Sequence, residues 1–380
     1  MKEIDKYRSE IDAIDNNIRD LFEKRIAITT EIAEYKKKNK LPVLNSMRER
    51  EIIARVTKNQ PDMLASLTKT LFNTIFDLSK ANQTAILGEN SETSAEIRRA
   101  IAETPTLMPK SAVVACQGTE GSNSQHACEK CFDRPDILYF NSFDGVFNAV
   151  ENGLCKYGIL PIENSLHGSV RSVYDAMITH KFHIVRSVKL KINHFLVAKG
   201  GVKLEDIREI YSHEQALSQC SKFLSSLKNV KLVECKNTAI AAKMVSESDR
   251  CDIAAISSVE CAELYDLAVL KKDIQSNDNN YTRFICISKD LEIYPGANKI
   301  SLMLTIPHKP GSLYELMSQF SALGVNLTKL ESRPIQGRDF EFMFYFEMDA
   351  SVCSDEIISL ISHLECTLDS FSFLGNYSEI

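Results

Sequence analysis

The sequence contains no tryptophan, and its first glycine is Gly88. A stretch of 87 residues without glycine, interrupted only by Pro42 and Pro61, predicts an all-helical segment. No apolar run reaches the ~18 residues that a membrane-spanning helix needs, and the charged first residues do not resemble a secretion signal. Eleven cysteines scattered over 380 residues are too few for a disulfide scaffold, so we expect reduced thiols and a cytoplasmic location.

Charge is distributed unevenly along the chain. The net charge is −6, but residues 1–87 hold 16 Lys and Arg against 13 Asp and Glu, a balance of +3 that leaves −9 for the rest. An acidic chain has no general attraction to nucleic acid, and we expect neither nucleic acid nor a membrane as a partner. The basic bias of the helical segment instead predicts an anionic small-molecule ligand there.

Composition and periodicity divide the chain into four segments. Residues 1–88 are expected to be all-α, and residues 89–110, rich in Glu, Ser, Thr and Pro, to form a linker with some helix near 95–102. Residues 111–290 alternate short buried strands with helical stretches, which predicts an α/β domain with largely parallel pairing. Residues 298–380 follow the order βαββαβ, which is typical of a small ferredoxin-like α+β domain.

Residues 4–35 carry a heptad pattern that holds for more than four repeats, which predicts one long helix with a packing seam. At ~1.5 Å per residue this helix would span roughly 48 Å, more than a domain of this size can cover, so we expect it to pack on a second copy of itself. The seam consists of Ile4, Ile11, Ile18, Arg25 and Ile32 in one row and of Tyr7, Ile14, Leu21, Ile28 and Tyr35 in the other.

Arg25 interrupts this seam, and a buried guanidinium needs a partner. That partner is a carboxylate either of another helix or of a ligand, and the sequence leaves both alternatives open. Lys36 lies about three turns further on nearly the same face, whereas Arg8 lies ~25 Å back along the helix. In an antiparallel dimer, Arg8 of the second chain can approach Arg25 of the first. Three cations around one apolar pocket suit a dianionic small molecule.

Residues 1–87 resemble the AroQ-type chorismate mutase domain at the front of bifunctional P-proteins. The similarity lies in residues 8–15 (RSEIDAID), Lys24-Arg25, Lys36, Pro42-Val43, residues 48–51 (RERE), Ser79 and Gln83. It implies an intertwined dimer in which Arg8 enters the partner's site. The implied chorismate-binding residues are Arg8, Arg25, Lys36, Asn45, Glu49, Ser79 and Gln83, with Lys36 and Gln83 as the catalytic pair that stabilises charge on the ether oxygen. Such a rearrangement needs a held conformer and fixed cations, and no cofactor.

Four polar motifs stand at strand ends or helix starts within residues 111–290. They are residues 118–124 (GTEGSNS), 161–170 (PIENSLHGSV), 212–215 (SHEQ) and 280–284 (NYTRF). Each alone is a weak signal, but together and in this order they resemble prephenate dehydratase. The resemblance implies two α/β lobes around a cleft, similar to type II periplasmic binding proteins. It also implies a reaction that removes water and CO2 from prephenate to give phenylpyruvate.

By this resemblance Thr282 donates to the leaving hydroxyl group and Arg283 binds a carboxylate. Threonine is a poor acid, so Glu163 is the second candidate proton donor, and the sequence does not decide between them. Cys128 and Cys131 lack a second pair at ligand spacing, so we expect no metal site. The other residues implied to bind prephenate are Ser122, Asn164, Ser165, Ser212 and Gln219.

Residues 298–380 contain two further motifs, 310–314 (PGSLY) at a helix start and 331–334 (ESRP) at a strand end. They resemble the signature segments of the ACT domain of P-proteins, which binds L-phenylalanine between paired domains. The residues implied to bind L-phenylalanine are Gly311, Ser312, Leu313, Asn326, Glu331 and Ser332. The chain departs from the usual family residues at Asn45, Thr119, Asn123, Ser312 and Tyr314.

These observations predict a homodimeric or larger bifunctional enzyme of phenylalanine biosynthesis, with chorismate and prephenate as substrates and feedback inhibition by L-phenylalanine. The alternative is an amino-acid-sensing regulatory protein with a vestigial catalytic site, because bilobed and ACT domains also occur in regulators. A regulator needs an output module, and no helix-turn-helix with a basic face is visible in the sequence, which favours the enzyme.

Overall fold

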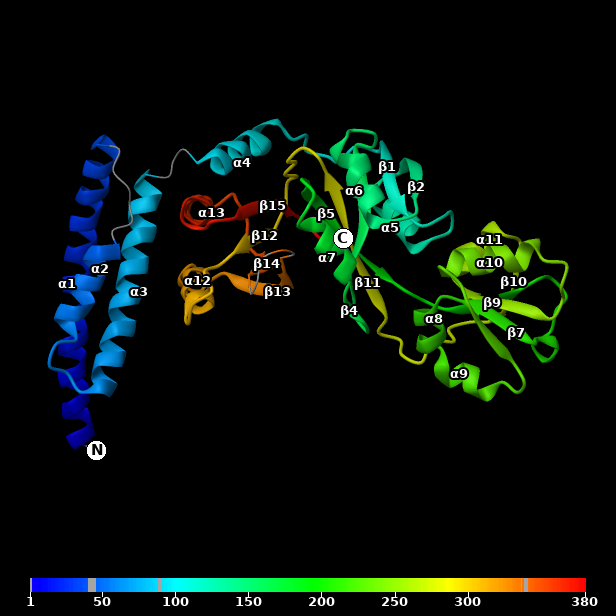
Figure 1. Ribbon diagram of the computed structural model, residues 1–380, viewed down its shortest axis with the longest axis horizontal. Coiled ribbons are helices and arrows are strands. Elements are labelled where there is room, and N and C mark those ends of the chain that lie inside the picture. The colour runs from blue at the N-terminus through cyan, green and yellow to red at the C-terminus, as the bar shows by residue number, and fades with distance from the viewer. Residues whose placement is uncertain (1, 40–45, 88–90, 336, 338–340) are drawn as a thin grey trace. The chain divides into compact units, whose positions relative to one another are not determined.

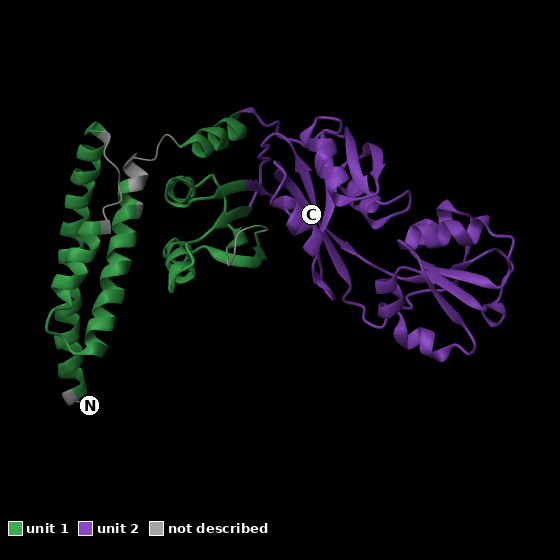
Figure 2. Ribbon diagram, in the orientation of Figure 1, with its two compact units in different colours: residues 1–102, 300–373 green, residues 103–299, 374–380 purple. Residues whose placement is uncertain are grey.

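The computed structural model describes residues 2–39, 46–87, 91–335, 337 and 341–380, and it separates into two compact units (Figures 1 and 2). Unit 1 combines residues 1–102 with residues 300–373, and unit 2 combines residues 103–299 with residues 374–380. Each unit therefore contains stretches that are far apart in the sequence. Within the described residues, no helix is both long enough and apolar enough to cross a bilayer.

The first part of unit 1 is helical, and the prediction of one long helix is confirmed. Helix α1 packs along α3, with Thr29 and Ala33 of α1 buried. The nine apolar residues of the predicted seam of α1, by contrast, are 42% to 65% exposed within the single chain. A following helix lies in the expected linker, and its start is hydrogen-bonded to α13, where Thr93 Oγ1 donates to Glu365 Oε1 at 2.7 Å. The helices are α1 (Lys2–Asn39), α2 (Ser46–Val56), α3 (Asp62–Leu87) and α4 (Glu92–Glu103).

The C-terminal elements follow the predicted order βαββαβ. Their four strands form one sheet in the order β13-β14-β12-β15, so that β13 stands at an edge. Leu316 and Phe320 on one helix face are buried because apolar residues repeat at helical spacing. The elements are β12 (Lys299–Thr305), α12 (Ser312–Ala322), β13 (Asn326–Pro334), β14 (Phe342–Asp349), α13 (Asp355–Thr367) and β15 (Phe371–Tyr377).

Unit 2 begins with an α/β lobe whose sheet runs in the order β2-β1-β3-β11-β5, with β4 paired to β3. Strand β3 is apolar along almost its whole length, as expected for a strand buried between helices. The elements of this lobe are β1 (Ser111–Gln117), α5 (Asn123–Cys131), β2 (Arg134–Phe140), α6 (Phe143–Glu151), β3 (Tyr157–Asn164), β4 (Gly168–Ser169), α7 (Arg171–Met177), β5 (His183–Lys191) and β11 (Tyr281–Ser288).

A second lobe is inserted between β5 and β11, and its sheet runs β10-β6-β9-β7-β8. The chain therefore crosses between the lobes twice, at residues 192–194 and 272–280, as the expectation of two lobes requires. The elements of this lobe are β6 (Phe195–Ala198), the 3₁₀ helix η1 (Leu204–Asp206), β7 (Glu209–Ser212), α8 (Glu214–Gln219), α9 (Ser221–Ser226), β8 (Lys231–Glu234), α10 (Thr238–Glu247), β9 (Ile253–Ser257), α11 (Val259–Leu264) and β10 (Ala268–Lys271).

The prediction of largely parallel pairing is only half right. Strand β1 pairs in parallel with β2 and β3, and β7 pairs in parallel with β8 and β9. The strands that enter or leave a lobe, β5, β6, β10 and β11, pair antiparallel with their neighbours. The alternation of strands and helices carries no information about these crossing strands, because their direction depends on where the chain re-enters each sheet.

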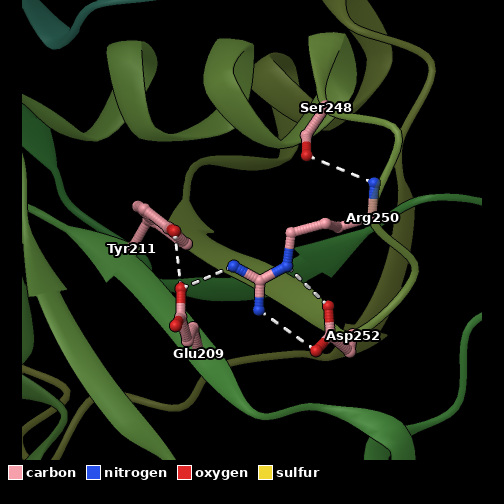
Figure 3. Close-up of polar contacts among 5 residues, drawn as sticks. All are labelled: Glu209, Tyr211, Ser248, Arg250 and Asp252. Carbon is pink, nitrogen blue, oxygen red and sulfur yellow. Dashed lines mark hydrogen bonds and ion pairs between the residues drawn. The ribbon is translucent and has the colours of Figure 1, made fainter.

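An ion-pair cluster in the second lobe joins Glu209 on β7 to Arg250 and Asp252, which precede β9 (Figure 3). Arg250 Nε lies 2.8 Å from Asp252 Oδ1, and Arg250 Nη1 lies 2.9 Å from Glu209 Oε2. Tyr211 donates its hydroxyl to the same Glu209 oxygen at 2.7 Å. The hydrogen bond from Arg250 lowers the pKa of the Asp252 carboxyl group. The cluster connects the turn before β9 to β7.

Candidate active sites

A cleft of about 410 Å³ lies between the two lobes of unit 2. Polar side chains from both lobes and from both crossing segments line it, as the carboxyl ends of strands in α/β sheets commonly do. Among the described residues, the polar lining consists of Gln117, Ser122, Asn123, Ser124, Asn164, His194, His213, Gln215, Gln219, Lys236, Asn237, Thr238, Asn280 and Thr282.

Asn164 and Thr282 are paired across strands β3 and β11 in this cleft. Asn164 Nδ2 donates to Thr282 Oγ1 at 3.0 Å. The orientation of this amide is determined by the backbone, because Asn164 Oδ1 accepts hydrogen bonds from the N–H groups of Leu166 at 3.0 Å and His167 at 3.1 Å. The Thr282 oxygen therefore accepts a hydrogen bond inside the protein, which leaves its O–H as a donor toward the cleft.

A second polar group joins the lobes at the crossing segments. Gln219 Oε1 accepts hydrogen bonds from His194 Nε2 at 2.7 Å and from Asn280 Nδ2 at 2.8 Å. Asn280 Oδ1 in turn accepts from Asn164 Nδ2 at 2.9 Å. Asn280 is fully buried, and burial lowers the pKa of His194. Because two donors occupy Gln219 Oε1, the amide NH2 of Gln219 is the part that can serve as a donor elsewhere.

Three helix starts also lie at the cleft. Ser122 caps α5, His213 caps α8 and Asn237 caps α10, and all three line it. Helix N-termini carry partial positive charge and attract anions. Lys236 is the single Lys or Arg among the described residues that line the cleft.

Two of the predicted prephenate-site residues lie outside this lining. We expected Arg283 to bind a substrate carboxylate and considered Glu163 as a proton donor. Instead, Arg283 Nη2 lies 3.2 Å from Glu163 Oε2, and neither residue belongs to the described lining. The reason is strand alternation: Thr282 and Phe284 face the cleft, and the residue between them faces the other side of the sheet.

Two predicted serines are also elsewhere. Ser212 is fully buried and donates its hydroxyl to the carbonyl oxygen of Ile256 at 2.7 Å, inside the second lobe. Ser165 Oγ donates to the Asn279 carbonyl oxygen at 2.7 Å and accepts from the Tyr281 N–H at 2.9 Å. Ser165 therefore braces the segment that leads into β11.

A second site lies between α1 and α3 in unit 1, where the structure brings together four of the predicted chorismate-site residues. Arg25 Nη1 donates to Ser79 Oγ, and Lys36 Nζ donates to Gln83 Oε1 at 3.2 Å. Ser79 is 3% exposed and Gln83 is 8% exposed. Burial lowers the pKa of both Arg25 and Lys36. Two partly desolvated cations beside two buried polar side chains form a site for an anion.

The remaining predicted chorismate-site residues lie apart from these four. Arg8 is highly exposed and contacts Asp5 at 3.4 Å, and Glu49 contacts Lys80 at 3.6 Å. Asn45 lies outside the described residues. The exposed position of Arg8 within one chain agrees with the expectation that it serves a neighbouring copy.

The predicted phenylalanine site is spread over α12 and β13. Gly311, with φ of +92°, is the N-cap of α12, and Ser312 follows as a buried residue whose Oγ atom has no hydrogen-bond partner among the described residues. Leu313 continues the helix. Glu331 and Ser332 lie on edge strand β13, which begins at Asn326.

Sequence analysis missed the roles of three cleft residues. Asn280 stands in the quoted motif 280–284 but was assigned no role, although a polar residue two positions before Thr282 could have indicated one. Lys236 precedes a helix start, and a search for cations at strand ends would have found it. No local pattern distinguishes His194.

The Cys128–Cys131 pair is part of the core. Both thiols are buried on α5, together with Cys116 and Cys286. A hydrogen bond with Cys116 and burial raise the pKa of Cys128, so its thiol stays protonated at neutral pH. Among the described residues, no three His, Cys, Asp or Glu side chains are placed to hold a metal ion.

Comparison with known proteins connects both sites to known chemistry. Residues 114–292 match the prephenate dehydratase family, and residues 7–84 match chorismate mutase type II. The chain is 36% identical over 276 residues to arogenate dehydratase/prephenate dehydratase 2 of Arabidopsis thaliana, covering 70% of this chain and 72% of that protein. It is 28% identical over 380 residues to the bifunctional chorismate mutase/prephenate dehydratase of Aquifex aeolicus, covering 99% of this chain and 98% of that protein.

A solved structure extends the comparison to three dimensions. Prephenate dehydratase from Arthrobacter aurescens in complex with L-Phe is similar with a TM-score of 0.64 and 30% identity, covering 70% of this chain and 89% of that one. The two family matches, at residues 7–84 and 114–292, contain both candidate sites described above. The chain therefore belongs to the prephenate dehydratase family, in the bifunctional form in which a type II chorismate mutase domain precedes the dehydratase.

Proposed function

We propose that prephenate binds in the cleft between the lobes of unit 2 and that Thr282 donates to its leaving hydroxyl group. The observation that carries this assignment is the 3.0 Å hydrogen bond from Asn164 Nδ2 to Thr282 Oγ1. Because that bond occupies the acceptor side of the threonine oxygen, the Thr282 O–H points its hydrogen toward a ligand in the cleft. The position of Glu163 beside Arg283, outside the described lining, favours Thr282 over Glu163 as the donor.

The dehydration does not require a strong acid beside the leaving hydroxyl group. As the ring C–O bond breaks, the departing oxygen gains negative charge, accepts the hydrogen bond from Thr282 and leaves as hydroxide, which takes a proton from the solvent to become water. The electron pair of the bond to the carboxylate forms the new ring double bond, and CO2 departs. Because aromatisation drives these steps, a positioned hydrogen-bond donor at the leaving oxygen is sufficient assistance.

The carboxylates of prephenate need positive partners, and we assign this role to Lys236 and to the starts of α5 and α10. Ser122 and Asn237 cap these helices at the cleft. Gln219 is held by His194 and Asn280 and presents its amide NH2 to the substrate. Arg283 acts on the far side of the sheet as a positioning residue, because its guanidinium is paired with Glu163.

We further propose that chorismate binds between α1 and α3. Arg25 and Lys36 would hold its carboxylates, and Lys36 and Gln83 would stabilise the ether oxygen as its bond breaks. Arg8 would enter from a second copy of the chain, which makes the enzyme a homodimer or a larger assembly. The exposed apolar seam of α1 supports this proposal, since nine large apolar side chains in one stripe are typical of an interface.

Phenylalanine is proposed to inhibit the dehydratase by binding to the βαββαβ elements, which we assign as an ACT domain. The buried Oγ of Ser312, which has no hydrogen-bond partner in the part of the chain that the structure describes, lies at the start of α12 and suits a carboxylate. The carboxylate of Glu331 suits the ammonium group. Edge strand β13 leaves room for a paired domain, and a relative of 30% identity was solved in complex with L-Phe.

We assign residues 1–88, 111–290 and 298–380 to mutase, dehydratase and regulatory functions, joined by residues 89–110. The family matches at residues 7–84 and 114–292 support the first two assignments. A cytoplasmic location is supported by the eleven cysteines, all within the described residues and all free.

Comparison of Thr282→Ala with Thr282→Ser tests the catalytic assignment. Removing the hydroxyl should lower dehydratase kcat by about 100-fold or more, while serine, which keeps the donor, should retain most of it. Prephenate and arogenate should both be assayed as substrates, since several relatives are named arogenate dehydratases. Mutase activity of the same preparations is the control. Substantial turnover by folded Thr282→Ala would show that another group serves the leaving hydroxyl.

A further inference from the structure

Residues 374–380, which comprise the last four residues of β15 and the three residues after it, belong to unit 2 and contact β5 of its first lobe. Gly375 has φ of +148°, and a Cβ atom there would lie 2.2 Å from the carbonyl oxygen of Ile184 on β5. Tyr377 is 1% exposed. The segment is therefore an integral part of the lobe that carries Thr282.

Beyond Tyr377 the chain adds a short parallel ladder to β5. The Ser187 N–H donates to the Ser378 carbonyl oxygen at 3.0 Å, and the Ile380 N–H donates to the Ser187 carbonyl oxygen at 3.0 Å. The Lys189 N–H then donates to the Ile380 carbonyl oxygen at 2.9 Å. This ladder determines where the side chain of Glu379 lies.

Within the described part of the chain, Glu379 is a carboxylate beside Arg283 in addition to Glu163. Its Oε2 lies 3.8 Å from Arg283 Nη1 and accepts a hydrogen bond from Ser187 Oγ at 3.3 Å. Arg283 Nη2 contacts Glu163 Oε2 at 3.2 Å, and the Arg283 side chain is only 13% exposed. In such a location a charge pair is screened less by water than on the surface, so each partner influences the position of the guanidinium.

Arg283 also lies next to an irregularity in the pairing of β11 with β3. Thr282 pairs with Asn164 and Arg283 pairs with Glu163, but the register between β11 and β3 shifts immediately afterwards, before Phe284. A bulge interrupts the backbone ladder and changes the direction of nearby side chains. The side-chain pairs of Arg283 therefore contribute to the angle at which Thr282 faces the cleft.

We propose that Glu379 is a positioning residue of the dehydratase: it holds Arg283 from the far side of the sheet and thereby orients Thr282. The proposal rests on the role assigned to Thr282. Glu379 lies outside the described cleft lining. Substitution of Glu379 should therefore change kcat, which reports turnover, more than KM, which reports substrate binding.

The test uses the full chain and a double-mutant cycle. Steady-state kinetics with prephenate should be measured for wild type, Glu379→Gln, Arg283→Gln and the double variant, together with melting temperatures. Ser378→Ala is the matched control, because Ser378 uses its backbone carbonyl in the same ladder. Glu379→Asp keeps the charge in case the glutamine variant folds poorly.

We expect Glu379→Gln to lower kcat by about fivefold or more with KM changed less than about twofold, and Glu379→Asp to recover part of that loss. In the Arg283→Gln background, Glu379→Gln should have no further effect, because it acts through Arg283. An unchanged kcat, a change in KM alone, or equal losses in both backgrounds would overturn the proposal. Loss of the Thr282 assignment itself would show separately, as activity in Thr282→Ala.

Discussion

At the scale of single residues, the role proposed for Thr282 depends on the direction of its hydrogen bonds. A threonine hydroxyl is a weak acid, so Thr282 is proposed to act as a hydrogen-bond donor. This role depends on Asn164, whose amide donates a hydrogen bond to the Thr282 oxygen. Two backbone N–H groups orient the Asn164 amide, so the threonine hydrogen is directed without any charged residue in contact. In the proposed mechanism, neutral groups with determined orientations take the place of a buried acid.

His363 on α13 predicts a pH-dependent loss of stability. Burial chiefly, with the nearby Lys80, lowers its pKa to about 4, whereas Asp77 opposes the shift. The folded state therefore binds fewer protons than the unfolded state between pH 6.5 and 4. The free energy of unfolding should therefore keep its full value above pH 6.5 and decrease by about 3 kcal/mol as the pH drops to 4.

Calorimetric melting between pH 7 and 4.5 measures this effect. His363→Gln should flatten the pH dependence, whereas the matched variant His308→Gln, at an exposed position, should leave it unchanged. Equal pH profiles for wild type and His363→Gln would contradict the prediction.

At the scale of elements, strand alternation separates residues that are adjacent in a motif. Thr282 and Arg283 belong to one short motif, yet they face opposite sides of β11. The same alternation places Asn164 in the cleft and Glu163 behind it, and the pairing Arg283–Glu163 follows from the strand register. A short motif on a strand therefore contains two kinds of residue: those that face the cleft, and those on the opposite side that contact neighbouring strands.

Gly375 predicts a large cost for one added methyl group. Gly375→Ala must accommodate both a left-handed backbone and a contact of 2.2 Å with the Ile184 oxygen. Gly153 is the matched control, because its φ is +75° and its added Cβ would meet nothing within 4 Å. Gly153→Ala should cost about 1 kcal/mol, and Gly375→Ala about 1–3 kcal/mol more.

Thermal melting and the temperature at which dehydratase activity is lost provide the comparison. Similar losses for the two variants would show that residues 374–380 are not held against β5 as described.

At the scale of the whole molecule, the proposed mutase site requires a second chain. Arg25, Lys36, Ser79 and Gln83 are together, but Arg8 is exposed and the apolar seam of α1 is uncovered within a single chain. A symmetric dimer would cover both seams and supply Arg8 to each site.

Mixing two inactive variants tests this shared site. Arg8→Ala and Arg25→Ala should each lose mutase activity, and mixed dimers should contain one intact site and one doubly damaged site. A fully exchanged equal mixture should therefore recover about one quarter of wild-type activity, as two-fold symmetry requires. No recovery in verified mixed dimers would exclude Arg8 as a residue of the neighbouring site.

Phenylalanine inhibition is best tested with site variants rather than by truncation. Deleting residues 296–380 would remove the segment 374–380 from the catalytic lobe and disturb the dehydratase directly. Glu331→Ala should weaken phenylalanine binding, measured by calorimetry, while Glu356→Ala on α13 should not. By linkage, phenylalanine and prephenate should weaken each other's binding by one common factor, about 5- to 150-fold. Wild-type affinity in Glu331→Ala would contradict the assignment.

Local sequence patterns determined much of this protein. The absence of glycine before Gly88 and the heptad seam were sufficient for the long helix α1, because helix formation depends on local spacing of apolar residues. The alternation of strands and helices, and the βαββαβ order at the end of the chain, were likewise readable. The resemblance carried by residues 280–284 and the other motifs was sufficient for the family.

Only the tertiary structure decided which way the residues of these motifs face and what they contact. Strand register decides that Glu163 and Arg283 face away from the cleft and that the crossing strands pair antiparallel. Contacts between residues distant in sequence bring His194, Lys236 and Asn280 to the cleft and place Glu379 beside Arg283. Such contacts form when a strand re-enters a sheet from another lobe or when residues 374–380 join β5. No local periodicity records them, because the free energy that selects them comes from packing and hydrogen bonding across the folded chain.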